Sequence, residues 1–139
     1  MRATTKTATL AILLVGVIAT VALAGTKIYE GTVGDNGVVQ FTVTAKHGKS
    51  KVRRFEFGQL DVTCSQGIAH LQGNFPDTVK VKNGSFTLTN DPPHGAYTES
   101  ATGKIAGKQA SGTLQVSGDI EPGYLDACDS GSVQWTASR

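Results

Sequence analysis

Apolar and polar side chains alternate along most of the chain after residue 24. This two-residue period is typical of strands that bury one face and leave the other in water. The alternating segments fall at Val39–Val43, Phe55–Phe57, Val79–Val81, Phe86–Leu88, Leu114–Val116 and Val133–Trp135. Polar, glycine-rich stretches separate them, and Asn83-Gly84 is the clearest turn because both residues tolerate the positive φ angles of a type I′ hairpin. The pattern therefore predicts strands joined by tight turns.

No segment after residue 24 has a sustained helical period, and only one short helical turn is predicted, at Ser65–Leu71. About eight strands at this spacing favour two packed sheets, so we predict an antiparallel β-sandwich or jelly roll. No linker divides residues 25–139, which are expected to form a single domain. Trp135 shares a strand face with Val133 and is expected to fill the core.

The first 24 residues have the features of a secretory signal peptide. Arg2 and Lys6 give a basic start, an apolar stretch follows, and Ala22-Leu23-Ala24 is a small-x-small cleavage site. The alternative is an uncleaved anchor, because the apolar run Ala8–Ala24 is at the short end of a membrane span. Either alternative places the rest of the chain outside the cytoplasm, so we expect a secreted or cell-envelope protein.

Two cysteines, Cys64 and Cys128, remain in the expected mature chain. Outside the cytoplasm an even pair predicts a disulfide, whereas the alternative is two buried free thiols. By chain entropy, a bridge across so long a loop would contribute about 4 kcal/mol to stability. The pair is therefore predicted to staple the domain.

The C-terminal part of the chain resembles a pattern found in short secreted bacterial proteins. In that pattern a strand with Ser-Gly-Thr, here Ala110–Val116, precedes a Cys-x-x-Gly turn and a terminal Trp-Thr-Ala strand, here Cys128–Ala137. Phe55–Phe57 and Cys64 also fit it. The resemblance implies an exported β-sandwich and carries no catalytic residues.

Candidate catalytic chemistry is sparse in the sequence. The histidines, His47, His70 and His94, lie in turn-like surroundings without metal-ligand spacing, and no Gly-x-Ser-x-Gly elbow is present. We predict no catalytic residues and no cofactor, although paired carboxylates that meet in space remain an alternative.

A basic hairpin is the first candidate binding feature. Its cations are Lys46, Lys49, Lys51, Arg53 and Arg54. They would attract an anionic polymer, such as one of the cell envelope, or a lipid surface, but the sequence favours the alternative of a solvated hairpin whose lysines prevent edge pairing. Nucleic acid is not expected, because no aromatic residue is interleaved for base stacking. Without Arg2 and Lys6, moreover, the 13 basic residues fall to 11 and equal the 11 acidic ones.

An acidic loop and three tyrosines are the other candidates. The loop carries Asp119, Glu121, Asp126 and Asp129. Oxygen-rich loops can hold calcium, but this spacing matches no EF-hand, and the alternative is an ordinary surface loop. The candidate carbohydrate-binding aromatics are Tyr29, Tyr97 and Tyr124, and the alternative is partial burial at sheet edges.

These observations favour a monomeric, non-catalytic binding module for a cell-envelope polymer or carbohydrate. The alternatives are a hydrolase of extracellular polymer and a purely structural envelope protein.

Overall fold

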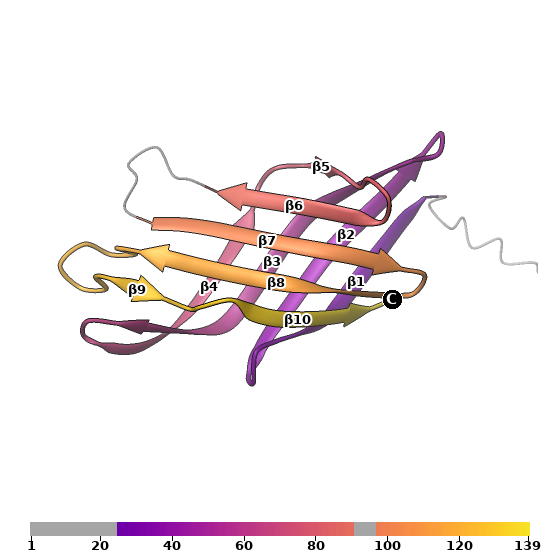
Figure 1. The fold of residues 1–139 in the computed structure, drawn as a ribbon. Coiled ribbons are helices and arrows are strands. Elements are labelled where there is room, and N and C mark those ends of the chain that lie inside the picture. The colour runs from indigo at the N-terminus through magenta and orange to yellow at the C-terminus, as the bar shows by residue number, and fades with distance from the viewer. Residues whose placement is uncertain (1–24, 91–96) are drawn as a thin grey trace, which may run out of the picture.

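The computed structural model describes residues 25–90 and 97–139, and in these ranges the chain forms strands and turns without a helix (Figure 1). The predicted signal peptide at residues 1–24 lies outside the described residues. Within the described ranges no helix has the length and apolarity to cross a membrane. The strands are β1 (Thr26–Val33), β2 (Gly37–Lys46), β3 (Lys49–Cys64), β4 (Gly67–Phe75), β5 (Val79–Lys80), β6 (Ser85–Asn90), β7 (Tyr97–Ala106), β8 (Gln109–Gly118), β9 (Cys128–Asp129) and β10 (Val133–Ser138).

Six of the strands close into an antiparallel barrel in the order β1-β2-β3-β9-β8-β10, with β10 returning to β1. β4 and β5 pair with β3, and β7 and β6 extend the sheet beyond β8. The predicted all-β antiparallel class is confirmed. The two separate sheets predicted for a sandwich or jelly roll are not formed by the described strands. Instead, β1 pairs with β10, and β9 pairs with both β3 and β8, so the strands belong to one continuous sheet. Alternation along a strand fixes which face is buried, but it carries no information on which strand lies alongside.

Two glycines allow neighbouring strands to approach closely, one where β1 closes the barrel against β10 and one where β8 meets β7. A Cβ built on Gly31 of β1 would lie 1.8 Å from the carbonyl oxygen of Thr136 on β10. A Cβ built on Gly112 of β8 would lie 1.8 Å from the carbonyl oxygen of Thr102 on β7. Any larger residue at either position would push the paired backbones apart.

Strand β3 spans 16 residues and keeps one buried face through two β-bulges. The bulge residues Arg54 and Gln59 are exposed and have φ angles of 51° and 54°. At each bulge, two residues of β3 lie opposite one residue of the neighbouring strand. This extra residue restores the alternation, so the apolar side chains before and after the bulge face the same core. The buried face comprises Val52, Phe55, Phe57, Leu60, Val62 and Cys64.

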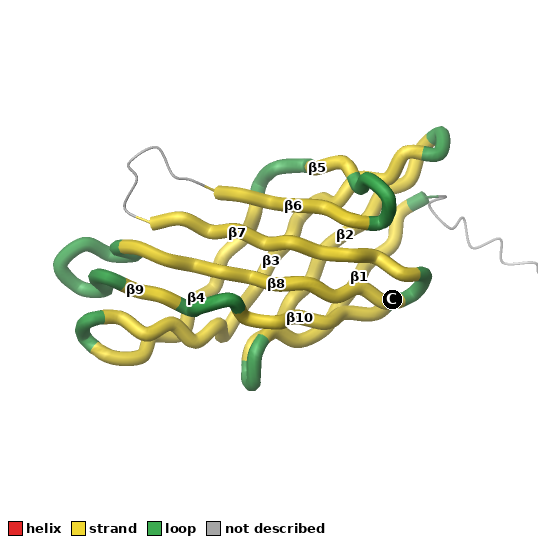
Figure 2. The backbone as a smooth tube through the Cα atoms, in the orientation of Figure 1, coloured by secondary structure: helices red, strands yellow, loops and turns green. Residues whose placement is uncertain are grey.

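The helical turn predicted at Ser65–Leu71 is wrong. Gly67–Phe75 form strand β4, and Ser65 and Gln66 lie in the turn that joins it to β3 (Figure 2). The inward side chains of β4 are the half-buried Ala69 and Leu71 and, at its end, the buried Phe75, with Gly73 between them. The apolar alternation is therefore too weak to predict the strand.

The core centres on stacked and edge-on aromatic rings. The ring of Phe41 lies 5.0 Å from Tyr29, 5.4 Å from Phe55 and 5.5 Å from Trp135, measured between centroids. Trp135 is buried as predicted, and its indole N–H donates to the carbonyl oxygens of Thr102 at 3.1 Å and Thr113 at 3.3 Å. The polar edge of the largest core side chain is thus satisfied by the backbone of β7 and β8.

The predicted disulfide is confirmed: Cys64 and Cys128 are bonded, with a sulfur–sulfur distance of 2.03 Å. The bridge joins the end of β3 to the start of β9. Hydrogen bonds reinforce this corner, since the Gln66 side chain donates to the carboxylate of Asp126 and accepts from its backbone N–H.

The Asn83-Gly84 turn also forms as predicted, with φ angles of 51° and 77° and reciprocal hydrogen bonds between Lys82 and Ser85. The hairpin is short because β5 turns aside to pair with β3 while β6 pairs with β7.

Candidate functional site

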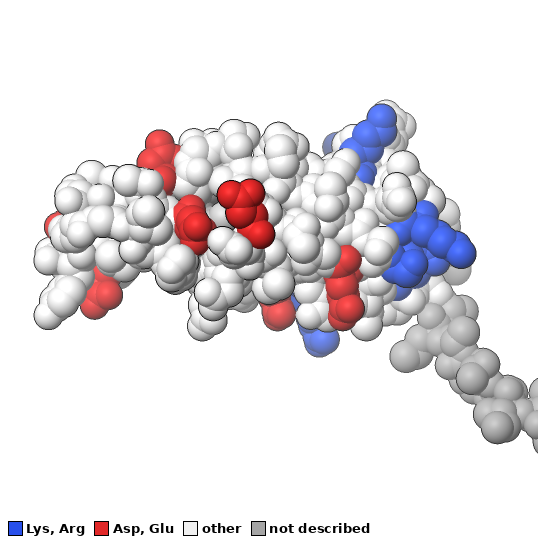
Figure 3. All heavy atoms as spheres, turned by 90° about the horizontal axis from the view of Figure 1, so that it is seen from below, with Lys and Arg blue, Asp and Glu red and all other residues white. Residues whose placement is uncertain are grey.

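The predicted basic hairpin forms part of a larger basic surface. Lys46 and Lys49 lie directly opposite each other at the end of the β2–β3 hairpin, and Lys51 lies opposite Thr44 on one side and Lys80 of β5 on the other. We use the name cationic face for Lys46, Lys49, Lys51, Arg53 and Lys80, all of which are exposed. In Figure 3 most Lys and Arg side chains lie towards one end of the molecule, and Asp and Glu lie over the rest of the view.

A broad groove of about 930 Å³ runs along this face. Its cations are Lys46, Lys49, Lys51 and Arg53, and the hydroxyl-bearing residues Thr26, Thr44 and Thr78 lie among them. In residues 25–90 and 97–139 no Lys or Arg lies within 4.0 Å of a carboxylate, so no cation of the cationic face forms a salt bridge. The groove therefore combines positive charge outside salt bridges with hydroxyl donors.

The sequence did not identify Lys80 as part of this surface, and it included Arg54, which lies apart from the groove. Lys80 is 29 positions from Lys51, and only the pairing of β5 with β3 brings the two together. Arg54 is exposed but occupies the bulge and does not line the groove. The alternation of valine and lysine around Lys80 indicated an exposed charge, but not its neighbour.

In the acidic loop, three of the four candidate metal ligands are hydrogen-bonded to backbone groups. Carboxylate oxygens of Asp119, Asp126 and Asp129 accept hydrogen bonds from the backbone N–H groups of Ala127, Gly123 and Gly131, at 2.7, 2.8 and 2.7 Å. Glu121 is exposed. Throughout the described part of the chain, no group of three or more His, Cys, Asp or Glu residues is placed to hold a metal ion. Three of the four carboxylates therefore serve the geometry of the loop.

The three tyrosines do not form a common platform. Tyr29 is 2% exposed, and its hydroxyl donates to the carbonyl oxygen of Gly107 at 2.9 Å, so it is a core residue and not a ligand aromatic. Tyr97 is half-buried against the core. Tyr124 is 74% exposed at the tip of the acidic loop. Only Tyr124 presents an open ring.

The histidines occupy separate positions. His47 lies at the exposed tip of the β2–β3 hairpin, whereas His70 Nδ1 lies 2.6 Å from Asp61 Oδ1 on the surface of β3 and β4. The described residues place no hydroxyl or thiol within hydrogen-bond distance of the His70 ring. His94 lies outside the described residues.

A buried carboxyl group, Glu99 of β7, was not singled out from the sequence. It is 6% exposed, and its Oε2 accepts a hydrogen bond of 3.0 Å from the Asn90 side chain. Gly73 of β4 leaves the space for it, since a Cβ there would lie 2.9 Å from Glu99 Oε1. Burial raises the pKa of Glu99 above its ordinary value, and the Asn90 hydrogen bond opposes that rise.

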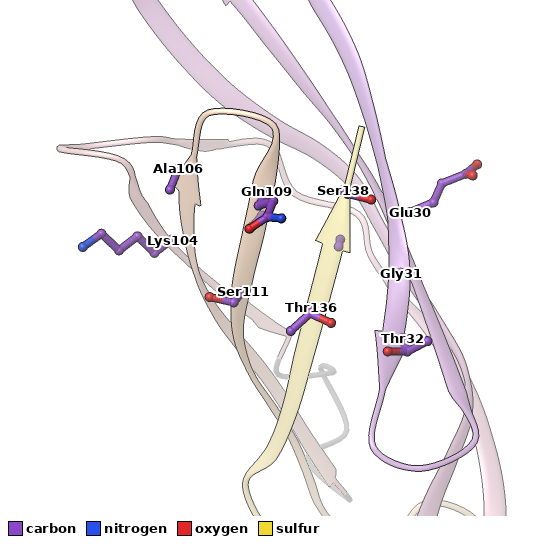
Figure 4. Close-up of a pocket in the computed structure, with 11 residues that line it drawn as sticks. Glu30, Gly31, Thr32, Lys104, Ala106, Gln109, Ser111, Thr136 and Ser138 are labelled. Carbon is purple, nitrogen blue, oxygen red and sulfur yellow. The ribbon is translucent and has the colours of Figure 1, made fainter.

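A second groove, of about 690 Å³, crosses β7, β8, β10 and β1 (Figure 4). Cross-strand pairing builds two rows in it. One row is Lys104, Ser111, Thr136 and Thr32, and the other is Ala106, Gln109, Ser138 and Glu30. Lys104 and Glu30 project outward at opposite sides of the groove. No sequence motif pointed to it, because its residues come from four separate strands.

A smaller hollow of about 390 Å³ lies between β1, β2 and β3. Glu30 pairs with Gln40, which pairs with Glu56, so two exposed glutamates flank one glutamine in the same row. Val38 and Gln72 also line this hollow.

Fold and surface together define an antiparallel β-barrel that carries a cationic face on three adjacent strands. The chain matches no protein-family model, no curated protein and no solved structure. Its resemblance to short secreted bacterial proteins therefore stays a prediction.

Proposed function

We propose that this protein is an extracellular, non-catalytic module that binds an anionic envelope polymer on its cationic face. The observation that carries the proposal is the direct opposition of like charges, Lys46 to Lys49 and Lys51 to Lys80, with no salt bridge to either pair among the described residues. Like charges placed opposite each other destabilise a sheet. An arrangement that costs stability and concentrates positive charge along a groove suits an anionic partner.

The shape of the surface favours a polymer over a small anion. Lys49, Lys51 and Arg53 alternate along β3, so successive cations lie about 6.6–6.8 Å apart along the strand. Exposed contacts of this kind are individually weak, and an extended ligand can engage several at once. Nucleic acid is disfavoured because the nearest aromatic residue on β3, Phe55, is 1% exposed and unable to stack on bases.

The test is electrophoresis in gels cast with a polyuronate, a poly(glycerol phosphate) or a sulfated dextran. We expect at least one of these polymers to retard the protein, with retardation that falls as salt rises. The variant Lys51→Gln with Lys80→Gln should weaken it several-fold. The matched control, Lys104→Gln with Lys108→Gln, removes the same charge elsewhere and should change it little. Equal weakening by both variants would show that only net charge matters and would reject the cationic face as a site.

One observation favours a second candidate, a hydrolase acting on extracellular polymer. Glu30 and Glu56 lie on either side of Gln40 beside a hollow, and two carboxyl groups that flank a glycosidic bond can serve as acid and as base or nucleophile. A reducing-end assay on the polymers that retard the protein tests this. Release that disappears in Glu56→Gln would support the hydrolase, whereas intact polymer after prolonged incubation would leave the binding module.

A further inference from the structure

The outward face of β6, β7, β8 and β10 is almost free of charge. Its outward residues are serine, threonine or glutamine, except for Lys104 and Ala106. They are Ser85, Thr87, Thr89, Thr98, Ser100, Thr102, Gln109, Ser111, Thr113, Gln115, Ser117, Gln134, Thr136 and Ser138. Protein surfaces normally mix both signs of charge, as the outer side of β1, β2 and β3 does here. This hydroxyl face is therefore unusual for its chemistry as well as its extent.

Strand pairing arranges the hydroxyl face in ordered rows. Thr87 pairs with Thr102, Thr102 with Thr113, and Thr113 with Gln134. Neighbouring members of a row lie about 4.8 Å apart. The hydroxyls of Thr102 and Thr113 are hydrogen-bonded at 2.8 Å. The polar groups are thus held in fixed positions by the sheet instead of sampling a mobile loop.

The second groove lies where this face continues from β7 and β8 onto the barrel strands β10 and β1 (Figure 4). Gly31, Ala110 and Ala137 also line the groove between the polar rows, and the side chains of Ala110 and Ala137 are buried in the core beneath it. Its volume of about 690 Å³ is within the range of small-ligand sites. Lys104 and Glu30 provide one charge of each sign, so the groove has no net attraction for a polyanion or a polycation.

We propose that this groove binds a segment of an uncharged polysaccharide. Hydroxyl and amide groups both donate and accept hydrogen bonds, as the hydroxyls of a sugar do. The exposed methyl group of Ala106 can contact the C–H face of a sugar ring, and the hydroxyl face offers a polar track along which a longer chain can continue. A charged polymer would lose part of its hydration in this groove without gaining a surface of opposite net charge. The site is separate from the cationic face and does not depend on the function proposed for it.

The groove lacks an exposed aromatic residue, which sets an expectation for affinity. None of its lining residues is Phe, Trp or Tyr, so stacking on a sugar face is absent. Binding should accordingly be weak for a short oligosaccharide and rise with chain length, as more of the hydroxyl face is engaged.

Electrophoresis in gels cast with neutral polysaccharides tests the proposal. The probes are a soluble β-glucan, an α-glucan, a mannan and a galactan, each compared with a gel without polymer. At least one should retard the protein. The variant Ser111→Ala with Thr136→Val removes two groove hydroxyls at nearly constant shape and should reduce retardation several-fold. The control, Ser65→Ala with Thr63→Val at the β3–β4 turn, makes the same chemical change outside both the groove and the hydroxyl face and should have little effect. Urea unfolding verifies that both variants fold.

Three results would overturn the proposal. They are no retardation by any of the four polymers, the same retardation for the wild type and the groove variant, and an equal loss in the control variant. Sedimentation tests a further outcome. If the wild type self-associates and the groove variant is a monomer, the groove binds a second copy of the chain instead of a polysaccharide. The variant Lys51→Gln with Lys80→Gln should keep its retardation by neutral polymer, so failure of this proposal is distinguishable from failure of polyanion binding.

Discussion

Gly103 of β7 makes room for the indole of Trp135. A Cβ built at Gly103 would lie 2.7 Å from Trp135 Cζ2 and 2.3 Å from Phe86 Cζ. The indole N–H also donates to the carbonyl oxygen of Thr102, the residue before this glycine. The absence of a side chain at one position therefore sets how deeply the largest core residue is seated.

Replacing this glycine should destabilise the barrel. Gly103→Ala adds a methyl group to a filled space, and overpacking of this kind costs about 1–3 kcal/mol in the free energy of unfolding. Urea unfolding followed by Trp135 fluorescence measures it. Gly58→Ala is the matched control, because its Cβ would make an ordinary 3.4 Å contact with Val38. A Gly103→Ala protein as stable as the control would show that the core can rearrange around the added methyl.

The same pair shows what the sequence could and could not predict. Alternation with Val133 was enough to place Trp135 in the core, because the period of a strand is a local property. The need for glycine at position 103 depends on a ring contributed by a strand about 30 residues away in sequence, and no local pattern carries that information.

The candidate site was predictable to a similar extent. The hairpin turn and four of the five cations of the cationic face followed from local charge and turn residues. Lys80 required the pairing of β5 with β3, and the bulge at Arg54 shifted one expected member away from the groove. Both depend on strand order and register, which alternation alone leaves open.

Removing the disulfide should lower stability without changing the fold class. Cys64→Ala with Cys128→Ala opens a bridge between residues separated by 64 positions, and loss of such a staple costs about 2–5 kcal/mol. The urea midpoint of the variant should fall, and the wild type under reducing conditions should behave in the same way. Identical midpoints for the oxidised wild type and the variant would mean that the corner bonds of Gln66 and Asp126 suffice.

The buried carboxyl of Glu99 should make stability depend on pH. Its pKa in the folded protein is raised by burial, so the folded state holds this proton more tightly than the unfolded state does. Stability contributed by the protonated group is present below the ordinary pKa of about 4.3 and is lost as the pH rises through the folded pKa. Glu99→Gln keeps the shape and removes the titration. The difference in the free energy of unfolding should therefore move in favour of the variant as the pH rises above the ordinary pKa of a glutamate.

A second variant checks the cause of this pH dependence. Asn90→Ala removes the hydrogen bond that opposes the pKa rise, so the decline in stability with pH should become larger. Chemical unfolding across the pH range measures both variants. A constant difference between Glu99→Gln and the wild type at all pH values would contradict a raised pKa.

Reversing one charge of the cationic face should separate stability from binding. Lys80 lies opposite Lys51, so Lys80→Glu replaces a repulsive cross-strand pair with an attractive one and should raise the free energy of unfolding by up to about 1 kcal/mol. Salt should reduce that gain, because the pair is exposed. The same change should weaken retardation by anionic polymer, and Lys80→Gln should be intermediate in both measurements. Thermal melts at low and high salt and gel electrophoresis provide the two readouts. A Lys80→Glu protein that is more stable but binds polyanion as the wild type does would remove Lys80 from the binding surface.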